Sequence, residues 1–353
     1  MKVLTVVGAR PQFIKAAPVS RLLRAKHDEF LLHTGQHYDD AMSDLFFRQL
    51  AIPAPDRNLE VGSGPHGAQT GAMLAGIESV AVEYRPDWML VYGDTNSTLA
   101  GALAAAKLHM RVAHVEAGLR SYDRSMPEEV NRVVADHVST LLLCPTDVAV
   151  SNLLQEGIAN GVRMVGDVMF DAFQENLARA RSDNRVLADL GIRPGEYHLL
   201  TVHRAENVDQ TDRLLAILRG VAASDRHVIF PAHPRTQAAL RAAGTELASN
   251  IRMIDPVGYL EMLVLEEGAE AIVTDSGGVQ KEAYFAGRPC ITLRDTTEWT
   301  DTVAAGWNVL VGSDPEKIAE AVRGFRPTKD RLALFGDGHA AAKVVEAIEE
   351  STA

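Results

Sequence analysis

Short apolar runs recur along the chain and alternate with longer segments whose apolar or small residues are spaced as on a helix. In the N-terminal half the runs are too short for helices and end in polar turns, as buried strands of a parallel sheet do. These runs lie at residues 1–7, 30–33, 88–91, 112–115, 140–144 and 162–165. The intervening segments predict helices up to residue 24 and at residues 40–50, 64–84, 98–108, 127–134 and 147–156. Repeated strand–helix alternation predicts a doubly wound α/β domain.

The C-terminal half repeats this pattern. Its apolar runs lie at residues 197–202, 228–231, 251–254, 271–274, 290–293 and 308–311. A chain of 353 residues is also longer than most single domains. We therefore expect two Rossmann-like doubly wound domains, residues 1–168 and 169–353, that face each other across a cleft. Packing of the last helix back on the N-terminal domain is left open.

Composition narrows the kinds of partner. The net charge is −12 and 46% of the residues are hydrophobic, so the chain offers no general surface for nucleic acid or an anionic membrane. An anionic ligand must then be held by local basic groups and helix ends. No apolar run is long enough to span a bilayer, and the N-terminus shows no charged-then-apolar signal. Cys144 and Cys290 lie in or beside apolar runs, which predicts buried thiols and suits a reducing, cytoplasmic compartment.

The segment around Ser276 is the strongest candidate for a phosphate site. Ser276, Gly277 and Gly278 follow an apolar run and precede a predicted helix. A strand, a small-residue turn and a helix start together place unpaired backbone N–H groups and the positive end of the helix dipole at one point. Glu282 comes about one and a half turns into that helix, where a carboxylate can accept from a ribose diol. An ordinary tight strand–helix connection has the same composition, so this segment alone does not decide.

Charged residues also follow the strands of the N-terminal half, at the edge where open α/β sheets bind ligands. Arg10 and Lys15 flank the start of the first helix, Asp94 stands at the tip of the strand at 88–91, and Glu116 directly follows the strand at 112–115. Arg10 and Lys15 have an alternative role as solvated loop charges. Asp94 has one as a helix cap, although the three residues after it can cap equally well. A carboxylate placed directly after a buried strand is a candidate for acid/base work.

The helix predicted at residue 127 opens with Glu128 and Glu129. Two carboxylates at a helix start are explained by the helix dipole, so we expect at most one of them to act in catalysis. Arg132, one turn after Glu128, is placed to orient it or to bind a phosphate.

Histidines follow two strands of the C-terminal half. His203 leads a cluster with Arg204 and Glu206, which favours ligand contact. His233 stands between Ala232 and Pro234, and structural and ligand-binding roles are equally open for it.

Taken together, these residues resemble the non-hydrolysing UDP-N-acetylglucosamine 2-epimerases nearly end to end. The matching strings are G-A-R-P-Q-F-I-K (8–15), T-G-Q-H-Y-D (34–39), Y-G-D-T-N-S-T (92–98), H-V-E-A-G-L-R (114–120), P-E-E-V-N-R (127–132), H-R-A-E-N (203–207), D-S-G-G-V-Q-K-E (275–282) and D-T-T-E-W (295–299). Their order and spacing make the combination specific. The resemblance implies a glycosyltransferase-B-like fold that binds a UDP-sugar and UDP, a homodimer, no metal or nicotinamide cofactor, and a place in polysaccharide biosynthesis.

The resemblance also implies roles for individual residues. It makes Asp94, Glu116 and Glu128 the catalytic carboxylates, with His203 close to the reacting groups. It makes the remaining candidates UDP-sugar contacts: Arg10, Lys15, Arg132, His233, Ser276, Gly277, Gly278 and Glu282. The implied reaction interconverts UDP-N-acetylglucosamine and UDP-N-acetylmannosamine by anti elimination of UDP, a glycal intermediate and re-addition of UDP.

Two departures from the family pattern, and one likeness to particular members, bear on the substrate and on regulation. The segment between Arg120 and Pro127 is shorter than in the best-known bacterial members. The stretch Gln36-His37 lacks the Q-H-x-x-M continuation used there for allosteric binding of a second substrate molecule. The D-T-T-E-W-T-D string resembles archaeal members and relatives that act on oxidised diacetamido sugars. A 2-epimerase of UDP-2,3-diacetamido-2,3-dideoxyglucuronate is therefore an alternative. Alternatives from other classes are a UDP-sugar glycosyltransferase of the same fold, a hydrolysing epimerase and a nucleotide-sugar sensor.

Overall fold

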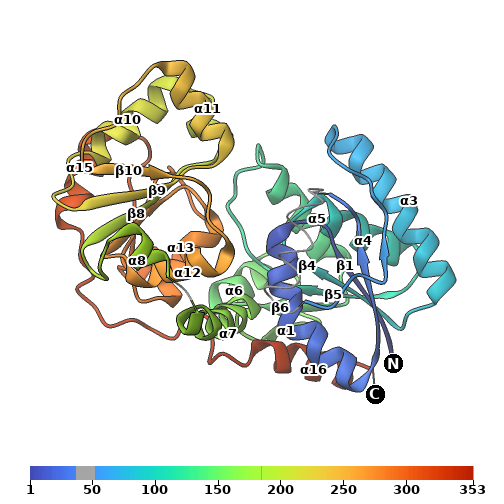
Figure 1. The fold of residues 1–353 in the computed structure, drawn as a ribbon. Coiled ribbons are helices and arrows are strands. Elements are labelled where there is room, and N and C mark those ends of the chain that lie inside the picture. The colour runs from blue at the N-terminus through green and yellow to red at the C-terminus, as the bar shows by residue number, and fades with distance from the viewer. Residues whose placement is uncertain (37–51, 184, 353) are drawn as a thin grey trace. The chain divides into compact units, whose positions relative to one another are not determined.

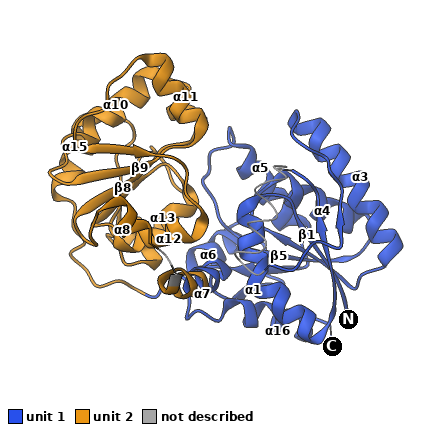
Figure 2. Ribbon diagram, in the orientation of Figure 1, with its two compact units in different colours: residues 1–174, 333–353 blue, residues 175–332 orange. Residues whose placement is uncertain are grey.

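The protein consists of two compact units, each built around its own parallel sheet (Figures 1 and 2). The computed structural model describes residues 1–36, 52–183 and 185–352. Unit 1 comprises Met1–Gln174 and Ala333–Ala353, and unit 2 comprises Glu175–Leu332. The sequence analysis placed the boundary after residue 168, whereas the units divide after Gln174 and the C-terminal segment joins unit 1. The cleft expected between the domains stays a prediction.

Unit 1 contains, among the described residues, a seven-stranded sheet in the order β3-β2-β1-β4-β5-β6-β7. Its strands are β1 (Lys2–Val7), β2 (Asp28–His33), β3 (Arg57–Asn58), β4 (Trp88–Tyr92), β5 (Arg111–Val115), β6 (Leu141–Cys144) and β7 (Val162–Met164). All neighbouring strands pair in parallel. The expected apolar runs of this half are thus confirmed as strands, and the short exposed strand β3 was not expected.

Helices cover both faces of this sheet (Figure 1). They are α1 (Arg10–Lys26), α3 (His66–Tyr84), α4 (Asn96–Lys107), α5 (Pro127–Val138), α6 (Asp147–Gln155), the first part of α7 (Val168–Asp183), and α16 (Ala340–Glu350), which packs on α1. Proline stands in the first turn of α1 and α5, where its missing N–H costs nothing. Side-chain caps from Thr95 and Thr146 begin α4 and α6. The helix predicted at residues 40–50 lies outside the described residues.

Unit 2 contains a six-stranded sheet in the order β10-β9-β8-β11-β12-β13, within the part of the chain that the structure describes. Its strands are β8 (Tyr197–Thr201), β9 (His227–Pro231), β10 (Ile251–Ile254), β11 (Ala271–Thr274), β12 (Cys290–Thr292) and β13 (Asn308–Leu310). Its helices are α8 (Val186–Leu190), α9 (Ala205–Val208), α10 (Thr211–Val221), α11 (Pro234–Ala243), α12 (Tyr259–Gly268), α13 (Gly277–Phe285), α14 (Thr300–Ala304) and α15 (Pro315–Gly324). All strand pairs are again parallel.

The sheet of unit 2 is buried on both faces. Successive residues of a strand point to opposite faces, and Leu199 and Leu200 of β8 accordingly join different apolar clusters. Leu199 packs with Leu265 of α12 and Ala283 of α13. Leu200 packs in the cluster formed by α10, α11 and α15. Two covered faces explain why these strands read as continuous apolar runs instead of alternating ones.

Each sheet has a topological switch point. In unit 1 β1 lies between β2 and β4, and in unit 2 β8 lies between β9 and β11. In unit 1 the chain moves from β1 to β2 on one side and from β4 to β5 on the other, and in unit 2 it does the same from β8 to β9 and from β11 to β12. In open α/β sheets, ligands bind at the carboxyl ends of strands at such a point. The fold thus marks one candidate binding edge in each unit.

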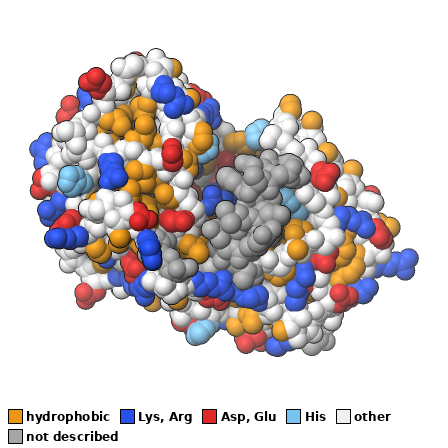
Figure 3. Space-filling model, in the orientation of Figure 1, with side chains coloured by type: hydrophobic (Ala, Val, Ile, Leu, Met, Phe, Trp, Pro, Cys, Tyr) orange, Lys and Arg blue, Asp and Glu red, His pale blue; other side chains and the backbone are white. Residues whose placement is uncertain are grey.

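Surface charge is mixed on the face of unit 2 that Figure 3 presents, where acidic and basic side chains are interspersed. Within the described residues, no helix combines the length and the apolar character needed to cross a membrane.

Candidate functional site

In unit 1, Lys15 and Glu116 form a buried ion pair at the carboxyl edge of the sheet. Lys15 lies on α1 and Glu116 directly follows β5, and Lys15 Nζ donates to Glu116 Oε1 at 2.6 Å. The two side chains are 11% and 6% exposed. Glu116 has a φ of 69°, a left-handed conformation that is rare for a residue with a side chain. Such strain persists where the surroundings impose it and is concentrated at functional sites.

Gly93 forms the backing of this ion pair. It has a φ of 62°, and a Cβ placed on it would lie 3.2 Å from Lys15 Nζ and 3.4 Å from Glu116 Oε1. Its N–H donates to the Val115 carbonyl at 2.9 Å, which ties the end of β4 to the end of β5. A side chain at Gly93 would thus crowd both charged groups as well as strain the turn.

Asp94 is paired with Arg132 next to this ion pair. Arg132 Nη2 donates to Asp94 Oδ2, and Arg132 Nη1 donates to Glu129 Oε2 at 3.0 Å. The Asp94 side chain keeps 28% of its surface exposed, whereas that of Arg132 keeps 4%. Thr95, not Asp94, caps α4, which confirms that Asp94 is not needed for capping. The sequence analysis expected Arg132 beside Glu128 or a phosphate, and in the structure it contacts Asp94 and Glu129.

The two glutamates at the start of α5 differ in their surroundings. Glu129 is buried and accepts from the backbone N–H groups of Ser121 and Tyr122, at 2.9 Å each, and from the Ser121 hydroxyl. These bonds hold the loop before α5 in place. Glu128 is exposed on the first turn of α5. Of the two, Glu128 is the carboxylate that a ligand could reach.

Arg10 is the first residue of α1 and is exposed. The loop before it is organised by Gln12, whose side-chain oxygen accepts from the N–H groups of Gly8 and Ala9 and whose amide donates to the Tyr92 carbonyl at 2.9 Å. Gln12 thereby connects the ends of β1 and β4. The connections that follow β1 and β4 are thus tied together, and they carry Arg10 and Lys15 on α1 and Asp94 on the loop before α4.

A buried polar network supports these loops from behind. His114 of β5 contacts Asp136 Oδ1 through Nδ1 at 2.8 Å and the Gly93 carbonyl through Nε2 at 2.7 Å. The other oxygen of Asp136 accepts from Gly118 N–H and from Arg120. Burial alone would raise the pKa of Asp136, but hydrogen bonds and charge from His114 and Arg120 hold it below its ordinary value. The sequence analysis did not single out this network, although His114, Gly118 and Arg120 of the H-V-E-A-G-L-R string contribute to it.

In unit 2, Asp275 organises the carboxyl edge at the switch point. It follows β11, is fully buried, and accepts from the N–H groups of His203 and Arg204 and from the amide of Asn207. His203 Nδ1 lies 3.2 Å from its Oδ1. Burial alone would raise the pKa of Asp275, but the hydrogen bonds and the His203 charge hold it below its ordinary value. The His203 side chain keeps 48% of its surface exposed. Asp275 was not among the predicted site residues, although the rule that selected Glu116 also fits it.

The start of α13 has the predicted form. Ser276 is its N-cap, and the Ser276 hydroxyl accepts from Val279 N–H at 3.4 Å. A Cβ on Gly277 would lie 2.4 Å from Glu298 Oε1, so a side chain here would displace the Glu298 carboxylate. Gly278 is exposed. The first N–H groups of a helix point outward from its start, as an anion site requires.

The two remaining predicted residues of unit 2 lie on different helices. Glu282 of α13 is 5% exposed and interacts with Glu266 of α12. His233 is the exposed N-cap of α11, and its Nδ1 accepts from Arg235 N–H at 3.2 Å. This hydrogen bond gives His233 a structural role and places its remaining proton on Nε2.

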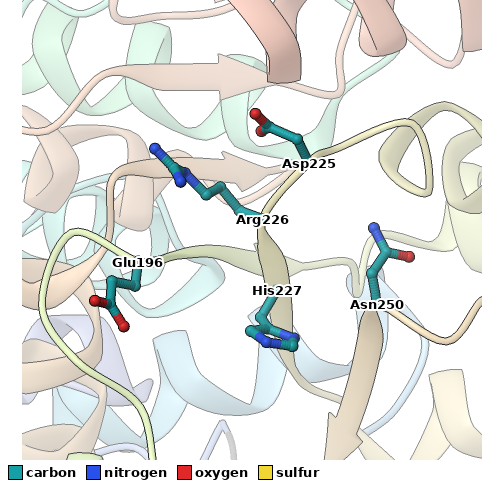
Figure 4. Close-up of a pocket in the computed structure, with 5 residues that line it drawn as sticks. All are labelled: Glu196, Asp225, Arg226, His227 and Asn250. Atoms are coloured by element: carbon teal, nitrogen blue, oxygen red, sulfur yellow. The ribbon is translucent and has the colours of Figure 1, made fainter.

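A surface pocket of about 320 Å³ lies elsewhere in unit 2. It is lined by Glu196, Asp225, Arg226, His227 and Asn250 (Figure 4). These residues lie just before or at the beginning of β8, β9 and β10, so the pocket is at the amino edge of the sheet. It is therefore separate from the switch-point edge. In the described residues, no group of three or more His, Cys, Asp or Glu side chains is arranged to hold a metal ion.

Comparison with known proteins identifies the family. Residues 21–349 match the family model of UDP-N-acetylglucosamine 2-epimerase. The chain is 51% identical to a UDP-N-acetylglucosamine 2-epimerase homolog of Methanococcus maripaludis, with 99% of each chain covered. It is 47% identical to the UDP-2,3-diacetamido-2,3-dideoxy-D-glucuronate 2-epimerase of Pseudomonas aeruginosa, with 98% of this chain and 99% of that protein covered.

Solved structures agree with this result. The crystal structure of UDP-GlcNAc 2-epimerase from Methanocaldococcus jannaschii, in complex with UDP-GlcNAc and UDP, matches with a TM-score of 0.91 at 46% identity, over 99% of this chain and all of that chain. The calicheamicin glycosyltransferase CalG4 matches with a TM-score of 0.53 at 14% identity, over 99% of this chain and 94% of that one, and therefore shows the fold alone. The predicted glycosyltransferase-B-like fold class is confirmed, and the chain belongs to the UDP-N-acetylglucosamine 2-epimerase family.

Proposed function

We propose that this protein interconverts UDP-N-acetylglucosamine and UDP-N-acetylmannosamine by inverting carbon two of the sugar. The observation that carries the proposal is the pair of acidic groups at the unit 1 switch point, Asp94 with Arg132 and Glu116 with Lys15. Two carboxylates on neighbouring loops supply the two acid/base groups that proton removal from one face and proton return to the other require. The matching family model and relatives support the same reaction.

The chemistry explains why acidic groups alone are not enough. The hydrogen on carbon two is not acidic, because no ketone lies beside it. Elimination of UDP across the bond between carbons one and two avoids this problem, since the departing diphosphate takes the electron pair. The resulting glycal is protonated on the opposite face and UDP adds back. Acid/base groups and a stable hold on the departing diphosphate are both needed.

In this proposal, unit 1 supplies the acid/base groups. Glu116, which accepts from Lys15 at 2.6 Å, is one proposed acid/base group, and Lys15 stays a proposed UDP-sugar contact. Asp94, kept partly exposed beside Arg132, is the second acid/base group. Glu128 is the third proposed carboxylate and is exposed at the start of α5. Arg10, at the start of α1, is a proposed diphosphate contact.

Unit 2 supplies the proposed contacts to UDP. The N–H groups of Ser276, Gly277 and Gly278 at the start of α13 would bind the diphosphate, helped by the helix dipole. His203 contacts Asp275 through Nδ1 and keeps 48% of its side chain exposed, so it is placed to stabilise charge on the leaving group. Glu282 would accept from the ribose hydroxyls, and His233 would contact the ligand through Nε2.

A second substrate has specific support. The relative from Pseudomonas aeruginosa is 47% identical to this chain, as is the UDP-N-acetylglucosamine 2-epimerase of Methanocaldococcus jannaschii, and it is named for UDP-2,3-diacetamido-2,3-dideoxy-D-glucuronate. The same elimination applies to that sugar, because the reacting bond between carbons one and two is unchanged. The substituents on carbons three and five would then decide between the two substrates.

Product analysis by proton NMR with a panel of UDP-sugars tests the proposal. We expect UDP-N-acetylglucosamine alone to yield its carbon-two epimer, with UDP as a minor product. Release of free sugar and UDP would indicate a hydrolysing enzyme, and no reaction without an acceptor would favour a glycosyltransferase. Epimerisation of the diacetamido uronate only would select the second substrate.

We also propose a cytoplasmic homodimer that serves polysaccharide biosynthesis. Cys144 and Cys290 are free buried thiols, as suits a reducing compartment. Light scattering coupled to gel filtration measures the oligomeric state, and a monomer at micromolar concentration would contradict the dimer.

A further inference from the structure

A fully buried carboxyl group lies behind the proposed ribose contact. Glu266 of α12 is 0% exposed, and both of its carboxyl oxygens are sealed from solvent. The helix packs on α13, and the carboxyl group interacts there with Glu282, which is 5% exposed. The neighbouring residues Leu265 and Ala269 belong to an apolar cluster. Two carboxyl groups thus meet inside an apolar region.

Such a pair cannot hold two negative charges without a large cost. Removing a carboxylate from water is unfavourable unless it is paired with a cation, and a second carboxylate nearby adds repulsion. The arrangement of lowest energy is one carboxylic acid and one carboxylate that share a proton. Glu266 is the more deeply buried of the two, at 0% against 5% exposed, and neither of its oxygens has a hydrogen-bond donor among the described residues, which places the shared proton on Glu266. Burial and the interaction with Glu282 accordingly raise the pKa of Glu266 well above its ordinary value.

The other titratable groups around Glu266 support this assignment. Burial raises the pKa of the Cys290 thiol of β12 to about 12, and the Glu266 charge adds to that effect. The Tyr197 hydroxyl of β8 donates to the Leu265 carbonyl at 2.6 Å. Burial raises the pKa of Tyr197. Arg288 opposes this effect, and Glu266 and Glu267 add to it. Tyr197 donates its proton to the Leu265 carbonyl, and the Cys290 thiol lies 3.5 Å from the Thr292 hydroxyl, so neither is the hydrogen-bond donor that an ionised Glu266 would need.

We propose that Glu266 is a positioning residue for nucleotide binding, a neutral carboxylic acid that donates a hydrogen bond to the Glu282 carboxylate. One oxygen of Glu282 is then fixed, and the remaining lone pairs are oriented toward the ribose hydroxyls. The part of this proposal that concerns ribose rests on the proposed function, whereas the shared proton does not.

The proposal predicts a pH effect with a definite sign. When rising pH removes the proton from Glu266, the hydrogen bond becomes a repulsion between two carboxylates. Glu282 then loses its orientation, and UDP affinity falls in the alkaline range. Replacement by glutamine keeps a neutral donor that cannot ionise, so the glutamine variant should bind UDP without this alkaline loss. Replacement by leucine removes the donor at all pH values.

Two measurements on the full-length protein test this. Infrared spectroscopy at neutral pH should show the carbonyl stretch of a buried carboxylic acid in the wild type and its loss in Glu266→Gln. Calorimetric titration with UDP should show roughly tenfold or more weaker binding by Glu266→Leu, because a hydrogen bond to a charged group is lost. Glu266→Gln should bind within about threefold of the wild type at neutral pH and more tightly than it at alkaline pH. Glu267→Gln, on the same helix but paired with Arg181, is the matched control and should keep the wild-type pH profile.

The outcomes separate this proposal from the proposed function. Absence of the carboxylic acid band in the wild type, or its persistence in Glu266→Gln, would overturn the shared proton. A Glu266→Leu variant that binds UDP as the wild type does would overturn the positioning role. If Glu266→Leu fails to fold, the alkaline comparison of Glu266→Gln with the wild type decides, and equal alkaline losses would refute the role. If the wild type shows the band but Glu282→Ala binds UDP unchanged, the ribose assignment of Glu282 fails and the shared proton stands.

Discussion

Replacing Lys15 by methionine tests the electrostatics of the unit 1 site most sharply. Methionine keeps the length and the apolar stem of the side chain but removes the charge that faces Glu116 at 2.6 Å. Glu116 is 6% exposed, so it would remain as a buried carboxylate without its cation. Breaking a buried ion pair from one side typically costs about 3–5 kcal/mol. Because both side chains keep slight exposure, we expect the lower end, a loss of about 3 kcal/mol.

The double variant Lys15→Met/Glu116→Gln shows whether the loss comes from the unpaired charge. In this variant no charge is buried, and the remaining cost is that of a polar amide without its donor, about 1–2 kcal/mol. It should therefore be more stable than Lys15→Met alone, although both should be inactive. The double variant should thus recover about 1–2 kcal/mol of the loss in Lys15→Met, and the single variant Glu116→Gln completes the cycle from which the coupling free energy is obtained.

The assay is urea unfolding followed by Trp88 fluorescence in a Trp299→Phe/Trp307→Phe background. Trp88 is fully buried in β4 of unit 1, so its signal reports the unfolding of that unit, and the two units need not unfold together. A loss below about 1 kcal/mol in Lys15→Met, or a double variant no more stable than Lys15→Met, would refute the reasoning.

Three further predictions follow from the same structure. Asp94→Asn should lower kcat by roughly two to four orders of magnitude while the fold is kept, since acid/base catalysis contributes about that much; steady-state kinetics would contradict this with a loss below tenfold. The pKa of His33 is lowered to about 4 by burial, against the opposing effect of a Gly8 backbone hydrogen bond, so the stability of unit 1 should be full above pH 6.5 and fall as the pH drops toward 4; urea unfolding across that range should show the decline, and His33→Phe should flatten it. Gly277→Ala should weaken UDP binding, because the new methyl group would lie 2.4 Å from Glu298 Oε1 and force that carboxylate, which pairs with Arg294 at 2.9 Å, to shift beside the start of α13; unchanged affinity in calorimetric titration would contradict this.

The strands could be predicted because both faces of each sheet are covered. Runs such as residues 88–91 and 271–274 are apolar throughout, and no other short element buries every side chain. Strand β3 could not be predicted in this way, since Arg57 and Asn58 are exposed polar residues that only complete the sheet edge. The positions of Asp94, Glu116 and Ser276 after strand ends followed from the same reasoning, because the carboxyl ends of parallel strands lie at one edge of their own sheet. Asp94 and Glu116 belong to the sheet of unit 1 and Ser276 to that of unit 2.

The partners of the site residues could not be predicted from local sequence. Lys15 meets Glu116 only because β4 lies between β1 and β5 in the sheet. Glu128 and Glu129 both lie in the first turn of α5, near the positive end of the helix dipole. Only Glu129 is buried, because it accepts hydrogen bonds from the loop at Ser121. The contact between Glu282 and Glu266 depends on how α12 packs on α13. Local pattern thus indicates which residues reach the edge, whereas long-range packing determines which of them are paired there.

Deuterium incorporation at carbon two tests the central claim most directly. Epimerisation of UDP-N-acetylglucosamine in deuterated water, followed by proton NMR, reports whether the hydrogen on that carbon exchanges with solvent through an acid/base group of the protein. Our account predicts that the epimeric product carries deuterium at carbon two. An epimeric product that retains its original hydrogen there would contradict it.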